Sequence, residues 1–136
     1  MEIKAEKLQW NNEWNSGNED VDKEHQELLA LLNDLINVSI IEMDFEKSID
    51  KLDILIEKIV NHFDTEEEFL ANMEYKDYDK HSKIHKNLIG KMFQLKQCYQ
   101  NRELNPSAFF SFLADDVIIE HLINEDIQFF NLFSKS

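Results

Sequence analysis

Glycine, proline and cysteine are all scarce in this 136-residue chain. Two glycines and one proline leave few positions at which a helix would break. With 43% hydrophobic and 31% charged residues, the composition favours amphipathic helices over strands. The single cysteine, Cys98, excludes an internal disulfide, and we interpret it as an ordinary packing residue. We therefore expect an all-α protein in a reducing cytoplasm.

Basic residues are outnumbered by acidic ones, and the formal net charge is −14. Nucleic acids and anionic membrane surfaces both need basic patches, so neither is an expected partner. The sequence also lacks an apolar run near the ~20 residues of a membrane span, and its first residues do not resemble a signal peptide. We expect a soluble cytoplasmic protein, a monomer rather than an oligomer, with a site that takes up cations.

The hydrophobic pattern divides the chain into an irregular arm, residues 1–17, and four helices. We expect Trp10 and Trp14 of the arm to cover one end of the core. Asp44 is a predicted N-cap, and Asn105 followed by Pro106 predicts another helix start. The helices are expected at about 19–37, 44–73, 79–101 and 106–133. Short connections between them predict a single domain, 1–136, folded as an antiparallel up-down-up-down bundle.

The segment HFDTE places His62 and Glu66 four residues apart, on one face of a helix, as metal ligands often are. An isolated match of this kind is more often a solvated surface feature. Glu66, however, lies on an apolar stripe, and burying a bare carboxylate costs several kcal/mol or more. The neighbouring Glu67 and Glu68 are interpreted as solvated surface. The stripe is expected to contain Phe45, Ile49, Leu52, Ile56, Ile59, Phe63, Glu66, Leu70 and Met73.

The other histidines change the balance, because they also lie on inward-facing stripes. His25 shares a stripe with apolar residues of the first helix, and His121 belongs to the apolar band of the last. His81 and His85 are one turn apart with no apolar residue between them on that face. Two buried imidazoles would repel each other if charged and compete for partners if neutral, and a metal ion resolves both problems. A metal site in the bundle core is therefore predicted.

The order and spacing of these residues resemble the seven-ligand pattern of the hemerythrins, including their bacterial single-domain members. The resemblance covers nearly the whole chain. It implies that three histidines hold one iron and two hold the other, while two carboxylates bridge the irons. In that assignment the first iron is bound by His81, His85 and His121, the second by His25 and His62, and the bridges are Glu66 and Asp126.

Spacing alone would choose a different bridge on the last helix. Glu125 follows His121 by four residues, as Glu66 follows His62, whereas Asp126 follows it by five, about 140° around an ideal α-helix. The family pattern has an aspartate at this second position, and we therefore choose Asp126. Val117 departs from the family pattern, because many bacterial members carry a tryptophan there, and this departure concerns the size and access of the pocket rather than the metal site.

Other metal sites fit the sequence less well. Ferritin-like di-iron proteins use mostly carboxylates with Glu-x-x-His pairs, and this chain has no such pair. A zinc protease would need His-Glu-x-x-His, but no histidine here is followed by glutamate. Seven converging nitrogen and oxygen ligands exceed one tetrahedral zinc site, so a carboxylate-bridged iron pair fits better.

The ligand set also indicates chemistry. Five histidines, two bridging carboxylates and a bridging hydroxide leave one position open on two six-coordinate irons. The resemblance implies that O2 binds there, on the iron with two histidines, and is held as a hydroperoxide beside an oxo bridge while both irons become ferric. The formal charge of the site does not change, which helps binding stay reversible in a low-dielectric core.

Reversible binding also needs a pocket that excludes water and general acids. The expected pocket wall is apolar: Leu28, Leu29, Phe63, Leu113, Val117 and Ile118. We expect a non-enzymatic O2-binding protein for storage, delivery or scavenging. Two alternatives stay open: an O2 or redox sensor that acts through an unidentified protein partner, and a di-iron enzyme that handles peroxide or nitric oxide or repairs iron centres.

Overall fold

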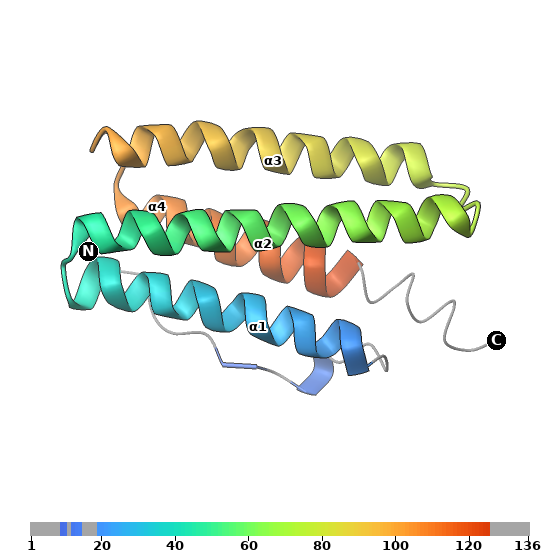
Figure 1. Ribbon diagram of the computed structural model, residues 1–136, viewed down its shortest axis with the longest axis horizontal. Coiled ribbons are helices and arrows are strands. Elements are labelled where there is room, and N and C mark those ends of the chain that lie inside the picture. The colour runs from blue at the N-terminus through green and yellow to red at the C-terminus, as the bar shows by residue number, and fades with distance from the viewer. Residues whose placement is uncertain (1–8, 11, 15–18, 126–136) are drawn as a thin grey trace.

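The computed structural model describes residues 9–10, 12–14 and 19–125. Within them the chain forms a short 3-10 helix, η1 (Asn12–Trp14), and four long helical segments joined by short connections (Figure 1). Two of these segments change from α-helical to π-helical winding along their length. The elements are α1 (Glu19–Ile36) with η2 (Asn37–Ile41), α2 (Phe45–Asn72), α3 (Tyr78–Gln100), and α4 (Pro106–Ser111) with η3 (Phe112–Glu125).

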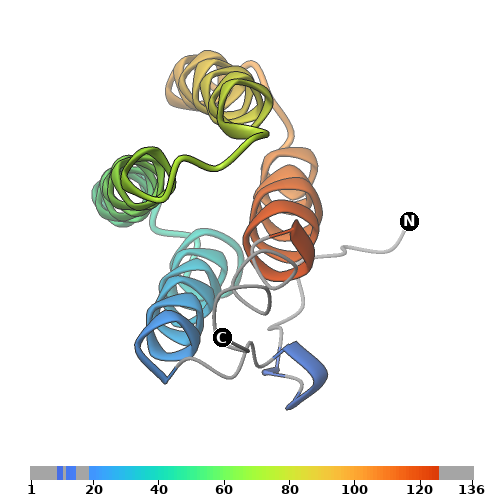
Figure 2. The same cartoon turned by 90° about the vertical axis from the view of Figure 1, so that its right-hand side faces the viewer.

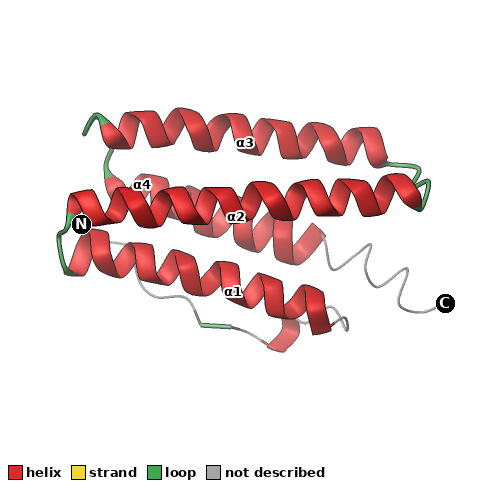
Figure 3. Ribbon diagram, viewed as in Figure 1, coloured by secondary structure: helices red, strands yellow, loops and turns green. Residues whose placement is uncertain are grey.

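The four segments run alternately in opposite directions, as the colours of Figure 1 show. Viewed towards their ends in Figure 2, they surround a common interior, with α1 packed against α2 and η3, and α3 against α2 and α4. No strand occurs in the described part of the chain (Figure 3). The predicted all-α antiparallel bundle is confirmed. None of the described helices is long and apolar enough to cross a membrane.

Two predicted helix starts are found at their expected residues. The Asp44 side chain accepts a hydrogen bond from the Lys47 backbone nitrogen at 3.1 Å and so caps α2. Asn105 accepts one from the Ser107 backbone nitrogen at 2.9 Å, with Pro106 in the first turn of α4. The first helix is longer than the predicted range 19–37, because it continues to Ile41 as η2, where Val38 is buried in the core.

The connections between helices use left-handed backbone at residues other than glycine. Met43, Glu74 and Arg102 have φ angles of 56°, 53° and 60°, and each follows the end of a helix. A residue in this conformation commonly ends a helix and usually is glycine. With only two glycines in the chain, the three turns accept a conformational cost instead.

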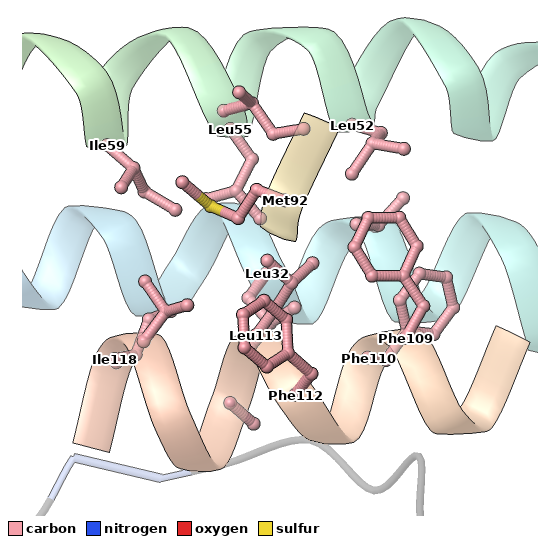
Figure 4. Packing of buried hydrophobic residues seen from close by; sticks show 14 of the residues in the cluster. Leu32, Leu52, Leu55, Ile59, Met92, Phe109, Phe110, Phe112, Leu113 and Ile118 are labelled. Carbon is pink, nitrogen blue, oxygen red and sulfur yellow. The ribbon is translucent and has the colours of Figure 1, made fainter. Parts of the chain in front are cut away.

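The apolar stripes of the helices meet in one core (Figure 4). Leu32, Leu52 and Leu113 are completely buried and come from three different helical segments. Met73 is a correction to the predicted stripe, because its side chain is 48% exposed. It lies just after the last residue of α2, where the helical period no longer directs side chains inward.

Trp10 and Trp14 are partly buried against this core, and their rings meet edge to face with centroids 5.5 Å apart. The rest of the predicted arm, and the part of the last predicted helix that follows Glu125, lie outside the described residues.

A cluster of hydroxyl groups lies at the end of the core where α2 begins and α3 ends. The Tyr99 hydroxyl is 2.7 Å from the Ser48 Oγ and 2.9 Å from the Ser39 Oγ. Tyr99 and Ser48 are buried, and the Ser48 Oγ also donates to the Phe45 carbonyl oxygen. We call Ser39, Ser48 and Tyr99 the hydroxyl cluster.

Candidate metal centre

The second polar cluster of the core lies towards the other end of the bundle, where α2 ends and α3 begins. It contains all five histidines of the chain and Glu66, and every one of these side chains is buried. They come from four helical segments, because each segment turns one side of its surface towards the bundle interior. We call this set the histidine cluster.

Three of the histidines form one group, with His81 and His85 on α3 and His121 on η3. Their ring centroids are 4.5 Å apart for His81 and His85, 4.7 Å for His85 and His121, and 5.1 Å for His81 and His121. Phe63 of α2 stacks on the His85 ring with centroids 4.0 Å apart and meets His121 edge to face. The aromatic ring therefore limits the rotation of two of the three imidazoles.

The other two histidines form a second group. His25 of α1 and His62 of α2 meet edge to face with ring centroids 5.2 Å apart. The sequence prediction divided the histidines between two metal ions in this same way, three and two. The structure brings each set together in space, while the role of the residues as ligands stays a prediction.

Glu66 lies between the two groups, and its two carboxylate oxygens face different sides. Oε1 contacts the His81 Nε2 and is 3.1 Å from the His85 Nε2. Oε2 is 3.2 Å from the His62 Nε2. A carboxylate whose oxygens face two separate sets of imidazole nitrogens has the arrangement that a bridging ligand requires.

Burial also prepares the histidines for a metal. The loss of solvent lowers the pKa of His25 to about 4, and the nearby His62 lowers it further. The same loss of solvent lowers the pKa of His121 to about 3, with His85 as the next cause. Both imidazoles are therefore neutral at pH 7, which is the form that binds metal ions.

The donor set fits a metal ion in chemistry and in distance. One ligand atom each from Glu66, His81, His85 and His121 lies within 4.8 Å of the others, and all four residues are buried. The His85 Nε2 is buried and makes no hydrogen bond although Glu66 Oε1 is close. Imidazole nitrogens with a carboxylate suit zinc or iron, copper and nickel better than magnesium or calcium.

Two carboxylates outside this set hold the far sides of the imidazole rings. Glu67 Oε2 is 3.1 Å from the His85 Nδ1, and Glu67 Oε1 accepts a hydrogen bond of 2.7 Å from the Ser82 Oγ. Glu24 contacts the Nδ1 of His62, and this hydrogen bond lowers the pKa of the Glu24 carboxyl, with burial opposing it.

The interpretation of Glu67 as solvated surface is therefore wrong, whereas Glu68 is exposed as predicted. Glu67 directly follows Glu66, and Glu24 directly precedes His25, so neither shares its neighbour's helix face. Glu67 and Glu24 therefore lie off the histidine stripes, and the helical pattern does not predict their contacts. Only the packing of α1 and α3 against α2 brings these carboxylates to a histidine of another helix.

The predicted bridge Asp126 lies outside the described residues. Glu125, its competitor by α-helical spacing, is the last residue of η3. Because η3 is π-helical, its backbone hydrogen bonds join residues five apart rather than four. The α-helical angle that favours Glu125 therefore does not apply to this segment.

The predicted pocket wall is buried throughout, and Phe63, Leu113, Val117 and Ile118 are completely shielded from solvent. Leu28 also lines a surface cavity of about 230 Å³ between α1 and α2. Glu24 and His62 line the same cavity, so the two-histidine side of the cluster lies close to solvent. The remaining lining residues are Glu27, Lys58, Asn61 and Thr65.

Comparison with known proteins gives the family. Residues 16–133 match the family model of the hemerythrin HHE cation binding domain. The chain belongs to the hemerythrin family. It is 30% identical over 102 residues to a bacteriohemerythrin from Aquifex aeolicus (strain VF5), covering 75% of this chain and 76% of that protein.

A second relative extends the similarity over more of the chain. A myohemerythrin from Theromyzon tessulatum is 24% identical over 124 residues, which are 91% of this chain and 92% of that protein. The matched hemerythrin domain contains all five histidines and Glu66. The predicted membership is confirmed, and the buried histidine and glutamate cluster of this hemerythrin is suited to holding metal.

Proposed function

We propose that this hemerythrin holds two iron ions in the histidine cluster and binds O2 reversibly, for storage, delivery or scavenging. The observation that carries the proposal is the position of Glu66. Its Oε1 faces His81 and His85, and its Oε2 faces His62. One buried carboxylate thus joins two sets of imidazoles that would each hold a metal, and family membership supports iron.

The residues would divide between the irons by group. His81, His85 and His121 would hold one iron, and His25 with His62 the other, with Glu66 and Asp126 as bridges. An iron pair with an oxo or hydroxo bridge would supply the electrons for reversible O2 binding. The side with two histidines has the lower ligand count, and there we place the open position.

The apolar wall suits a carrier rather than an enzyme. Leu113, Val117 and Ile118 come from the segment that bears His121, and all are completely buried. Such side chains keep water and proton donors away from their face of the centre, so bound oxygen would leave unchanged rather than react further there. A non-enzymatic role is therefore part of the proposal.

Anaerobic reconstitution with ferrous iron followed by exposure to air tests this function. We expect two irons per chain and a charge-transfer absorption band that appears with O2 and disappears on deoxygenation. Irreversible bleaching, turnover of added peroxide or nitric oxide, or a metal content far from two per chain would contradict the carrier.

The pocket wall is tested separately with Leu113→Asn. A polar group in the wall should admit water and raise the autoxidation rate, at which the oxygenated protein irreversibly loses its bound oxygen as peroxide and can no longer bind O2. Leu52→Asn is the matched control, because Leu52 is equally buried but lies ten residues from His62, about 15 Å along α2. Equal decay rates in the two variants would show that Leu113 is not part of the wall.

A further inference from the structure

The His85 ring lies between the carboxylates of two consecutive residues of α2. Glu66 Oε1 is 3.1 Å from its Nε2, and Glu67 Oε2 is 3.1 Å from its Nδ1. An ionised carboxylate only accepts hydrogen bonds, so the Glu67 contact places the ring proton on Nδ1. The lone pair of Nε2 is then directed towards Glu66 and the interior of the cluster.

Glu67 is itself held in place. Its Oε1 accepts a hydrogen bond from the Ser82 Oγ at 2.7 Å, and its side chain is only 20% exposed. Ser82 directly follows His81 on α3. One turn of this helix therefore carries a histidine of the cluster and also fixes the carboxylate that contacts His85. Ser82, Glu67 and His85 form a connected chain that runs from α3 to α2 and back to the cluster on α3.

In the second group of histidines a carboxylate also contacts a ring Nδ1, but this carboxylate is more exposed to solvent. Glu24 of α1 contacts the Nδ1 of His62, and Glu66 Oε2 is 3.2 Å from the His62 Nε2. The Glu24 side chain, however, is 46% exposed and lines the cavity between α1 and α2. The same Nδ1 contact is thus made by a mostly buried and clamped carboxylate at His85, but by a half-exposed carboxylate at His62.

We propose that Glu67 and Glu24 are positioning residues, one for each half of the metal centre, and that the half containing His62 and Glu24 releases its metal first. This inference rests on the proposed function, because it takes the two halves to hold iron. Carboxylates that accept the Nδ1 proton of a ligand histidine fix its orientation and raise its basicity, and their loss typically weakens metal binding roughly 10- to 100-fold.

The test measures iron release from the full chain loaded with two ⁵⁷Fe ions and challenged with an excess of chelator. Wild type should lose iron in two phases, and Mössbauer spectra taken between the phases should show one of the two iron environments depleted. Glu24→Leu should accelerate the first phase, and Glu67→Leu the second, each by roughly 10- to 100-fold. Ser82→Ala should accelerate the second phase by a smaller factor, because Glu67 then keeps its position less firmly.

Glu27→Leu and Glu68→Leu are the matched controls. Glu27 lines the same cavity as Glu24, and Glu68 is the exposed neighbour of Glu67, so each control removes the same charge at almost the same place. Both should release iron like wild type. Glu24→Gln and Glu67→Gln keep a hydrogen-bond acceptor, and they should restore slow release while shifting the Mössbauer parameters of one iron, because the neutral amide polarises the imidazole less.

Release rates of Glu24→Leu and Glu67→Leu equal to those of the controls would overturn the proposal, as would acceleration of the first phase by Glu67→Leu. If circular dichroism shows that Glu67→Leu does not fold, Ser82→Ala and Glu67→Gln decide instead. Iron release at the wild-type rate in Ser82→Ala, together with an unchanged Mössbauer spectrum in Glu67→Gln, would count against Glu67 as a positioning residue. A wild-type protein that does not hold two irons contradicts the proposed function, whereas two irons with unaffected variants contradict only the positioning residues.

Discussion

The hydroxyl cluster and the histidine cluster are both buried polar groups in the same apolar core, yet they are satisfied in different ways. Each hydroxyl of Ser39, Ser48 and Tyr99 can donate one hydrogen bond and accept others. The three groups therefore join in contacts of 2.7 and 2.9 Å, and the series ends at the Phe45 carbonyl oxygen, which accepts from the Ser48 Oγ. Such a cluster needs nothing from outside the chain.

The histidine cluster cannot close in this way. A neutral imidazole has one N–H and one lone pair, and at His85 and His62 the N–H is directed to an outer carboxylate. At these two histidines the Nε2 lone pairs then face the oxygens of Glu66, so that acceptors face acceptors. A metal cation turns this arrangement from unfavourable to favourable. The polar residues of the hydroxyl cluster thus stabilise the fold by themselves, whereas those of the histidine cluster are arranged to bind a ligand.

The largest expected effect comes from removing the residue between the two histidine groups. Glu66→Ala should lose both irons, because its two oxygens face both groups. His62→Ala should lose chiefly the iron held with His25. Iron per chain, measured by elemental analysis after gel filtration, checks this difference, and equal loss of both irons in the two variants would contradict the division of roles.

Removal of the metal from wild type should have the next largest effect. Anything that binds only the folded state stabilises it, by about 2.7 kcal/mol per site when the free ligand is at 100 times its Kd. Two such sites would raise the Tm by roughly 10 to 20 °C in a chain of this size. Thermal unfolding followed by circular dichroism, with and without a chelator, measures this shift, and identical Tm values would show that the histidine cluster closes without metal.

A smaller effect is expected at the hydroxyl cluster. Tyr99→Phe removes the hydroxyl that joins Ser39 to Ser48 and should cost about 1–3 kcal/mol of the free energy of unfolding. The iron content should not change, because the hydroxyl cluster is at the other end of the bundle. Denaturant unfolding of Tyr99→Phe, with Tyr78→Phe at a partly exposed position as the control, checks the stability. Loss of iron in Tyr99→Phe would show that the two clusters are coupled.

The same contrast explains how far the sequence predicts the molecule. Helical periodicity and the residues Asp44, Asn105 and Pro106 determine local structure, so the bundle and its helix starts follow from the sequence. The inward placement of the histidines and Glu66 follows for the same reason, because a stripe on one helix is a local property.

Contacts between helices are not local, and there the sequence prediction is incomplete. Glu24 and Glu67 lie off the histidine stripes and reach a histidine only across a helix interface. The π-helical winding of η3 is not predicted from the sequence either, and α-helical spacing does not apply within this segment, which ends at Glu125.

The smallest effect is expected at an ion pair of the same α1–α2 interface that touches neither cluster. Lys51 Nζ is 2.8 Å from Asp34 Oδ2, with side chains that are 33% and 45% exposed. The hydrogen bond with Asp34 and the charge of Asp34 raise the pKa of Lys51. A raised lysine pKa means that the pair stabilises the fold below the ordinary lysine value, about 10.4, and loses this effect as pH rises through the raised value.

Lys51→Met should therefore lower the Tm only slightly at neutral pH, with the difference from wild type vanishing at strongly alkaline pH and iron content unchanged. Thermal unfolding across this pH range measures it. A loss of iron in Lys51→Met would contradict this prediction. So would a Tm change as large as that of Tyr99→Phe, because exposed ion pairs would then stabilise the fold as strongly as buried polar clusters do.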